Sequence, residues 1–116
     1  MNSVTIYHNP KCSKSRATLA LLERRGIAPH VIEYLTTPPS AAELNRILEL
    51  LDLEPRALMR KNEAEYRELG LDEASLTRSQ LIEAMVDNPR LIERPIVLAN
   101  GKAAIGRPPE NVEKII

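Results

Sequence analysis

Two apolar runs near the end of the chain, Ile96 to Ala99 and Lys102 to Ile105, are separated by the dipeptide Asn100-Gly101. Asn-Gly between two such runs is the strongest short-range signal for a β-hairpin, because both loop residues of the favoured turn need positive φ. The dipeptide therefore predicts an antiparallel pair of strands in this part of the chain.

The N-terminal part of the chain predicts a parallel pair of strands. Val4 to Tyr7 and Val31 to Tyr34 are short runs with the β-branched residues that strands favour. Between them, Ser13 or a neighbour can cap a helix that runs to about Arg25, where Gly26 is a typical stop. A strand, a helix and a strand in this order form a βαβ unit.

The middle of the chain differs from both ends in charge. Residues 1–37 hold five basic and two acidic side chains, a net charge of +3. Residues 38–93 hold seven basic and twelve acidic side chains, a net of −5, and residues 94–116 hold four and two, a net of +2. We expect a single domain over 1–116, in which a core of residues 1–37 and 94–116 is interrupted by an insertion of residues 38–93.

The insertion is predicted to be entirely helical. Two helix starts are marked by capping boxes, Ser40 with Glu43 and Thr77 with Gln80. The first is followed by apolar residues at helical spacing, Leu44, Ile47, Leu48 and Leu51. Shorter helices are expected to open at Pro55 and to cover Glu63 to Leu69, before Gly70.

The order of these elements predicts an α/β protein with a thioredoxin-like fold. Pro108-Pro109-Glu110 can start a closing helix through Val112 and Ile115, which completes a ββα unit after the hairpin. Joined to the βαβ unit, it gives a four-stranded mixed sheet with an all-helical insertion.

Composition excludes several classes of protein. The 16 basic and 16 acidic side chains cancel, and the chain has no Trp and no Phe, so it lacks the basic excess and the stacking surfaces of nucleic-acid binders. No apolar run approaches the roughly 20 residues of a spanning helix, and the N-terminus does not resemble a secretory signal. The one cysteine cannot form an internal disulfide. We therefore expect a cytoplasmic monomer with no nucleic-acid or membrane partner.

That cysteine, Cys12, lies between the end of a predicted strand and the start of a predicted helix. Backbone N–H groups and the helix dipole favour negative charge there, both a thiolate and an oxyanion beside it. His8, Lys11, Lys14 and Arg16 are near in sequence and add positive potential. The alternative is an inert, buried core cysteine.

Ser15 stands where a two-cysteine redox motif would have its second thiol. Any oxidised or adduct form of Cys12 must therefore be cleared by an external thiol. Ser15 could hydrogen-bond the thiolate or be an ordinary first-turn residue, and His8 could support the site or face water at a strand end. Thr18 occupies the position of the arginine in a C-x5-R phosphatase loop, so that motif is absent. No phosphate loop or metal-ligand pair is visible, and no tightly bound cofactor or metal is expected.

Several segments resemble the glutaredoxin-coupled arsenate reductases, the ArsC family, nearly from end to end. They are, in chain order, Tyr7-His8-Asn9-Pro10-Lys11-Cys12-Ser13-Lys14-Ser15-Arg16, Tyr34-Leu35-Thr36-Thr37-Pro38-Pro39, Arg60-Lys61-Asn62, Glu93-Arg94-Pro95-Ile96-Val97 and Gly106-Arg107-Pro108-Pro109-Glu110. The family likeness implies the same thioredoxin-like fold with a helical insertion.

The resemblance also implies roles for individual residues. It makes Cys12 the nucleophile, and His8 and Ser15 match positions that tune its thiolate. It assigns the binding of the oxyanion to three arginines, Arg60, Arg94 and Arg107. The guanidinium group is always charged and planar, which suits a tetrahedral oxyanion. The bond at this position is cis in thioredoxin-like proteins, so the resemblance implies a cis bond before Pro95, while a trans bond is also acceptable at the first residue of a strand.

The activity implied is that of an oxidoreductase: arsenate is reduced to arsenite, with glutathione as co-substrate and glutaredoxin as partner. Family members dedicated to arsenical resistance commonly have small uncharged residues after the cysteine, whereas this chain has Ser13-Lys14. Two alternatives stay open. One is a glutathione-dependent thiol–disulfide reductase without arsenate activity, and the other is a regulatory protein-binding module of the same superfamily.

Overall fold

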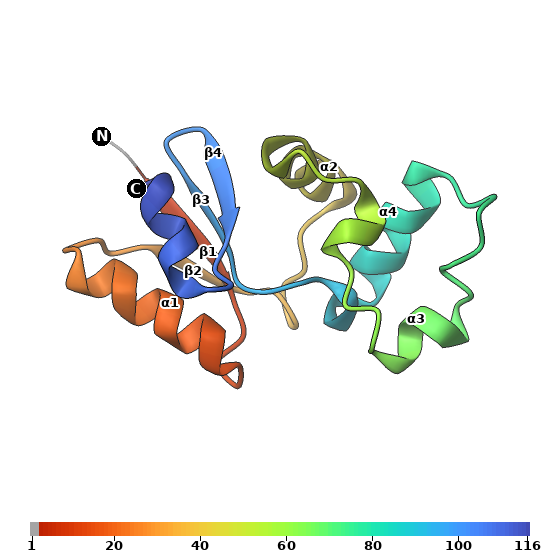
Figure 1. Ribbon diagram of the computed structural model, residues 1–116, viewed down its shortest axis with the longest axis horizontal. Coiled ribbons are helices and arrows are strands. Elements are labelled where there is room, and N and C mark those ends of the chain that lie inside the picture. The colour runs from red at the N-terminus through yellow and green to blue at the C-terminus, as the bar shows by residue number, and fades with distance from the viewer. Residues whose placement is uncertain (1–2) are drawn as a thin grey trace. The chain divides into compact units, whose positions relative to one another are not determined.

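The computed structural model describes residues 3–116 (Figure 1). The chain divides into two compact units, which we call the sheet unit and the helical unit. The sheet unit comprises the chain up to Thr37 together with Arg94–Ile116, and the helical unit is Pro38–Glu93. The division falls where the net charge of the sequence changes sign.

The sheet unit contains a four-stranded mixed sheet. Its strands are β1 (Val4–His8), β2 (His30–Glu33), β3 (Ile96–Ala99) and β4 (Lys102–Ile105), in the spatial order β2-β1-β3-β4. β1 runs parallel to β2 and antiparallel to β3, and β3 and β4 form the antiparallel hairpin. This is the sheet of the predicted thioredoxin-like fold.

One face of this sheet carries the core of the unit. Two helical elements, α1 (Ser13–Arg24) and η3 (Pro109–Lys114), pack against it and against each other. The core consists of buried side chains from the two central strands, from both helical elements and from the residue after η3: Val4, Ile6, Leu21, Leu22, Val97, Ala99, Val112 and Ile115. Because Leu21 and Leu22 are anchored in this core, the position of α1 on the sheet is fixed by burial of apolar surface.

The hairpin turn is the one predicted from the dipeptide. Asn100 and Gly101 both have positive φ, 54° and 72°. The side chain of Asn100 also donates a hydrogen bond to the carbonyl of Ile115 at 2.6 Å, which ties the turn to the end of the chain.

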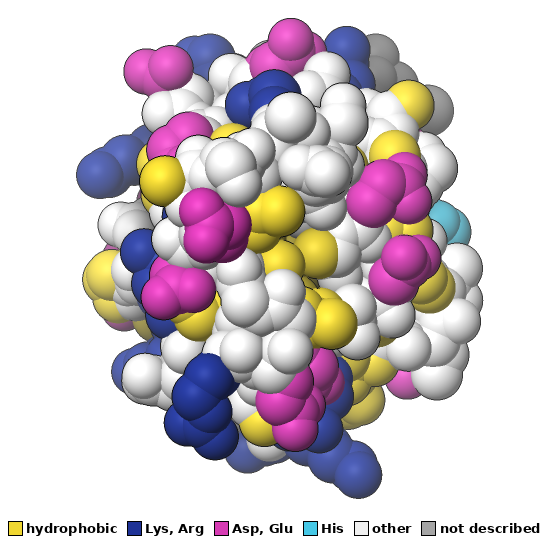
Figure 2. Space-filling model, turned by 90° about the vertical axis from the view of Figure 1, so that its right-hand side faces the viewer, with side chains coloured by type: hydrophobic (Ala, Val, Ile, Leu, Met, Phe, Trp, Pro, Cys, Tyr) yellow, Lys and Arg dark blue, Asp and Glu magenta, His cyan; other side chains and the backbone are white. Residues whose placement is uncertain are grey.

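The helical unit contains α2 (Ala41–Leu51), η1 (Pro55–Leu58), α3 (Ala64–Glu68), α4 (Arg78–Asp87) and η2 (Pro89–Leu91). Both predicted capping boxes are formed, at the starts of α2 and α4. Its fully buried side chains are Leu44, Ile47, Leu48, Leu58, Met85 and Leu91. Figure 2 shows one face of the molecule, on which several acidic side chains are visible. The sequence of this unit has an excess of acidic residues.

The predicted cap of α1, Ser13 or a neighbour, is Cys12, which a turn from Asn9 places at the N-cap. Two local predictions were wrong. The second strand ends at Glu33, and Tyr34 leaves the sheet with its side chain buried. The closing helix is a 3₁₀-helix that ends at Lys114, since its bonds join residues three apart, as from the N–H of Asn111 to the carbonyl of Pro108.

No helix within residues 3–116 is both long enough and apolar enough to cross a membrane.

Candidate active site

Cys12 lies at the junction of the β1–α1 loop and α1. It is the N-cap residue of this 12-residue helix, with extended backbone angles of φ −95° and ψ 124°. Its carbonyl accepts the N–H of Arg16 at 3.0 Å, and its own N–H donates to the carbonyl of Asn9 at 3.0 Å. The cysteine is free and only 8% exposed. The helix dipole therefore has its positive end at Cys12, where it stabilises negative charge.

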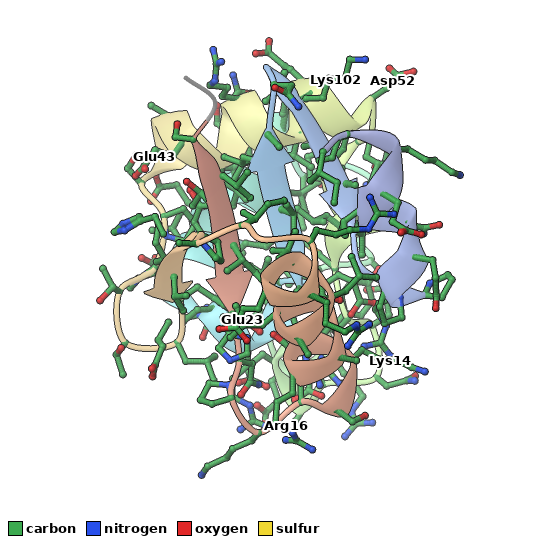
Figure 3. The ribbon with its side chains drawn as sticks, turned by 90° about the vertical axis from the view of Figure 1, so that its left-hand side faces the viewer. Lys14, Arg16, Glu23, Glu43, Asp52 and Lys102 are labelled. Atoms are coloured by element: carbon green, nitrogen blue, oxygen red, sulfur yellow. The ribbon has the colours of Figure 1, made fainter. Side chains whose placement is uncertain are left out.

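Short-range hydrogen bonds hold the loop that precedes this cysteine. The side-chain oxygen of Asn9 accepts the N–H of Lys11 at 3.0 Å. The guanidinium of Arg16 donates to the carbonyl of Pro10 at 2.9 Å. Lys14 and Arg16 extend from the first turn of α1 and are exposed (Figure 3). The loop is thus fixed by its own residues, and positive charge lies around it.

Buried polar side chains gather beside this loop. Among the described residues they are His8, Ser15 and Thr18, with exposed fractions of 6%, 0% and 0%. Nδ1 of His8 lies 2.6 Å from the hydroxyl of Ser15, which also accepts the N–H of Asn9 at 3.0 Å. Within the part of the chain that the structure describes, the Ser15 hydroxyl bonds to these two groups and not to the sulfur of Cys12. His8 is buried and does not face water.

Burial of the His8 imidazole favours its neutral form. Burial lowers the pKa of His8 below its ordinary value, since a charged ring would lose its hydration. The carboxylate of Glu33, its partner residue on β2, raises this pKa, and the charge of Arg16 lowers it. Either Nδ1 of His8 or the Ser15 hydroxyl supplies the proton of the contact between them, according to the tautomer of the ring.

Arg107 brings a guanidinium group to the sulfur. Its Nη1 lies 3.8 Å from Sγ of Cys12 and 3.4 Å from the carbonyl oxygen of Arg94. Arg94 is half-buried and Arg107 is exposed. The bond between Arg94 and Pro95 is cis, as expected, and the bond between Arg107 and Pro108 is also cis, which was not predicted.

Arg60, the third predicted arginine, belongs to the helical unit. Its Nη1 lies 2.9 Å from a carboxylate oxygen of Glu63, and its Nε lies 3.9 Å from a carboxylate oxygen of Glu93. Its role towards an oxyanion stays a prediction. The other five predicted site residues, His8, Cys12, Ser15, Arg94 and Arg107, belong to the sheet unit, and Arg94 contacts Arg107 through its backbone carbonyl.

Thr18 and Gly106 also contact each other beside this site, and the sequence did not single them out. The Thr18 hydroxyl lies 3.4 Å from the carbonyl of Gly106. A signal was present in the sequence: Ser15, Thr18 and Leu22 follow at intervals of three and four residues, which places both polar residues on the buried face of α1.

This arrangement suits attack on an oxyanion. A sulfur at a helix N-terminus, with a guanidinium beside it, can hold a tetrahedral anion close to a nucleophile. Within residues 3–116 there is no group of three or more His, Cys, Asp or Glu side chains that could hold a metal ion.

The sequence and the fold are similar to those of known proteins. The ArsC family profile matches residues 7–115. The uncharacterized protein YfgD of Escherichia coli K12 is 57% identical over 114 residues, 97% of this chain and 96% of that protein. The arsenate reductase of Neisseria meningitidis is 54% identical over 117 residues, the whole of both chains. The solved structure of the arsenate reductase from Vibrio cholerae has a TM-score of 0.96 and 58% identity over 98% of each chain.

Proposed function

From the finding that the chain belongs to the ArsC family, we propose that it is an arsenate reductase in which Cys12 is the nucleophile. The observation that carries this proposal is the contact of 3.8 Å between Nη1 of Arg107 and Sγ of Cys12 at the N-cap of α1. An anion bound by that guanidinium lies within reach of the sulfur. Relatives and structural neighbours named arsenate reductases support arsenate as the substrate.

In the first step the Cys12 thiolate attacks the arsenic atom of arsenate. A sulfur–arsenic bond forms, and one arsenate oxygen leaves as hydroxide, which takes up a proton to become water. Arg107 balances the negative charge of the anion, and the helix N-terminus acts in the same direction. The resemblance assigns Arg60 and Arg94 to the same anion.

In the second step glutathione supplies the electrons. Its thiolate attacks the Cys12 sulfur of the adduct, the electron pair of the sulfur–arsenic bond passes to arsenic, and arsenite leaves. Cys12 is then joined to glutathione in a mixed disulfide. Because the chain has no second cysteine, an external thiol must break this disulfide, and we assign that step to glutaredoxin.

The test is a coupled assay in which arsenate-dependent oxidation of NADPH is followed through glutathione reductase and glutaredoxin. We expect turnover by the wild type and none by Cys12→Ser. A parallel reaction with thioredoxin and thioredoxin reductase identifies the electron donor. Full activity of Cys12→Ser contradicts the mechanism, and reduction of a glutathione mixed disulfide without any arsenate turnover contradicts the substrate.

A further inference from the structure

We infer that Thr18 is a positioning residue, which holds Arg107 beside Cys12 through Gly106. The inference rests on the proposed function in one respect, that Arg107 acts on the anion attacked by Cys12. Thr18 itself touches neither the sulfur nor the anion in that mechanism.

The first observation is the environment of the Thr18 side chain. It is completely buried, and a buried hydroxyl needs partners because it has lost water. It donates to the carbonyl of Lys14 at 2.8 Å, within α1, and more weakly to the carbonyl of Gly106 at 3.4 Å. The second contact joins residues 88 positions apart and crosses from the helix to the segment that follows β4.

The second observation is the lack of space at Gly106. A Cβ built on this residue would lie 2.8 Å from Cγ of Pro95 and closer still to Oγ1 of Thr18. Its N–H donates to the carbonyl of Pro95 at 2.9 Å. The backbone of Gly106 is thus enclosed between a side chain of α1 and the proline that follows Arg94.

These contacts connect the segment that carries Arg107 with the helix that begins at Cys12. Arg107 follows directly after Gly106, while Cys12 is the N-cap of the helix that carries Thr18. The side-chain amide of Asn111 donates to the carbonyl of Arg107 at 3.1 Å and restrains the other side of this residue. Thr18 of α1, together with Pro95 and Asn111, therefore restrains the Arg107 backbone relative to the sulfur.

The test compares Thr18→Val, which replaces the hydroxyl with a methyl group of similar size, with Thr18→Ser, which keeps the hydroxyl. Val97→Ala is the matched control, because it removes core packing at a residue that is not among the nearest neighbours of a Cβ built on Gly106. We expect Thr18→Val to lower kcat/KM for arsenate by about fivefold, the factor for one hydrogen bond, mainly through KM. Thr18→Ser should stay near the wild type. Val97→Ala should lose thermal stability but keep kcat/KM.

A second readout needs no arsenate turnover. A guanidinium 3.8 Å from the sulfur stabilises negative charge there, and iodoacetamide reacts with that sulfur as a nucleophile. We expect both Thr18→Val and Arg107→Gln to slow alkylation of Cys12 at neutral pH, and the double variant to react no more slowly than Arg107→Gln. Thr18→Ala replaces Thr18→Val if the valine variant does not fold.

The outcomes distinguish a failure of the proposed function from a failure of the positioning role of Thr18. Absence of arsenate turnover in the wild type contradicts the proposed function, and the alkylation rates then decide the role of Thr18 alone. Alkylation of Thr18→Val at the wild-type rate overturns the inference. Independent effects of Thr18→Val and Arg107→Gln, which multiply in the double variant, overturn it as well.

Discussion

Replacement of Ser15 by alanine removes a buried polar contact beside the site. The hydroxyl is fully buried, lies 2.6 Å from Nδ1 of His8 and accepts the N–H of Asn9 at 3.0 Å. In Ser15→Ala both groups lose this partner. A buried group left without a partner costs about 1–3 kcal/mol. Asn9 is only half-buried, so water can replace its bond, whereas His8 is buried and bears most of the loss. We expect a loss of about 2 kcal/mol in the free energy of unfolding.

The assay is urea unfolding followed by far-ultraviolet circular dichroism at pH 7.5. The midpoint should fall while the slope with urea stays unchanged, because the surface exposed on unfolding is the same. Ser13→Ala is the matched control, the same substitution at an exposed position of the first turn of α1. Surface substitutions of this kind usually change stability by less than about 0.5 kcal/mol. If Ser15→Ala is no less stable than Ser13→Ala, the structural importance of the His8–Ser15 pair is refuted.

Three further predictions concern stability, each measured by the same urea unfolding. The pKa of His8 is lowered in the folded chain, so the unfolded chain takes up a proton at a higher pH and stability is lost as the pH falls through 6.5. Between pH 7.5 and 5.5, His8→Gln should therefore lose less of its free energy of unfolding than the wild type. Equal losses in the two proteins would contradict this. Ser40→Ala breaks a capping box of α2 and should cost about 1 kcal/mol, so an unchanged midpoint would count against a contribution of the cap. Met85→Ala empties a fully buried position and should cost about 2–5 kcal/mol, and a cost typical of surface residues would refute its place in the core.

Signals that lie within a few residues of one another were sufficient for most of the fold. The Asn100-Gly101 dipeptide predicted the hairpin because the preference for positive φ is local: it depends on the two residue types and not on the rest of the fold. The capping boxes at Ser40 and Thr77 were predictable for the same reason, since each joins residues three positions apart. The N-cap of α1 could be predicted only as Ser13 or a neighbour, because the turn that makes Cys12 the N-cap depends on a backbone hydrogen bond to Asn9 and not on a capping side chain.

Less of the candidate site than of the fold could be predicted from the sequence. Cys12 was singled out from its place between a strand and a helix, but its contact with Arg107 joins residues 95 positions apart. Spacing along the chain carries no information about such a pair, and only the family resemblance selected Arg107. The contact of Thr18 with Gly106 depends on how closely α1 approaches the segment after β4, which follows from packing of the whole sheet unit.

The central claim is that the sulfur of Cys12 attacks arsenate and passes to a mixed disulfide with glutathione. The most direct test is the intact mass of the protein after incubation with arsenate and glutathione, in the absence of glutaredoxin. Since Cys12 is the sole cysteine, an added thiol can be assigned to it without ambiguity. We predict a gain of one glutathione that requires arsenate and is removed when glutaredoxin is added. An unchanged mass, or the same gain without arsenate, would contradict the account.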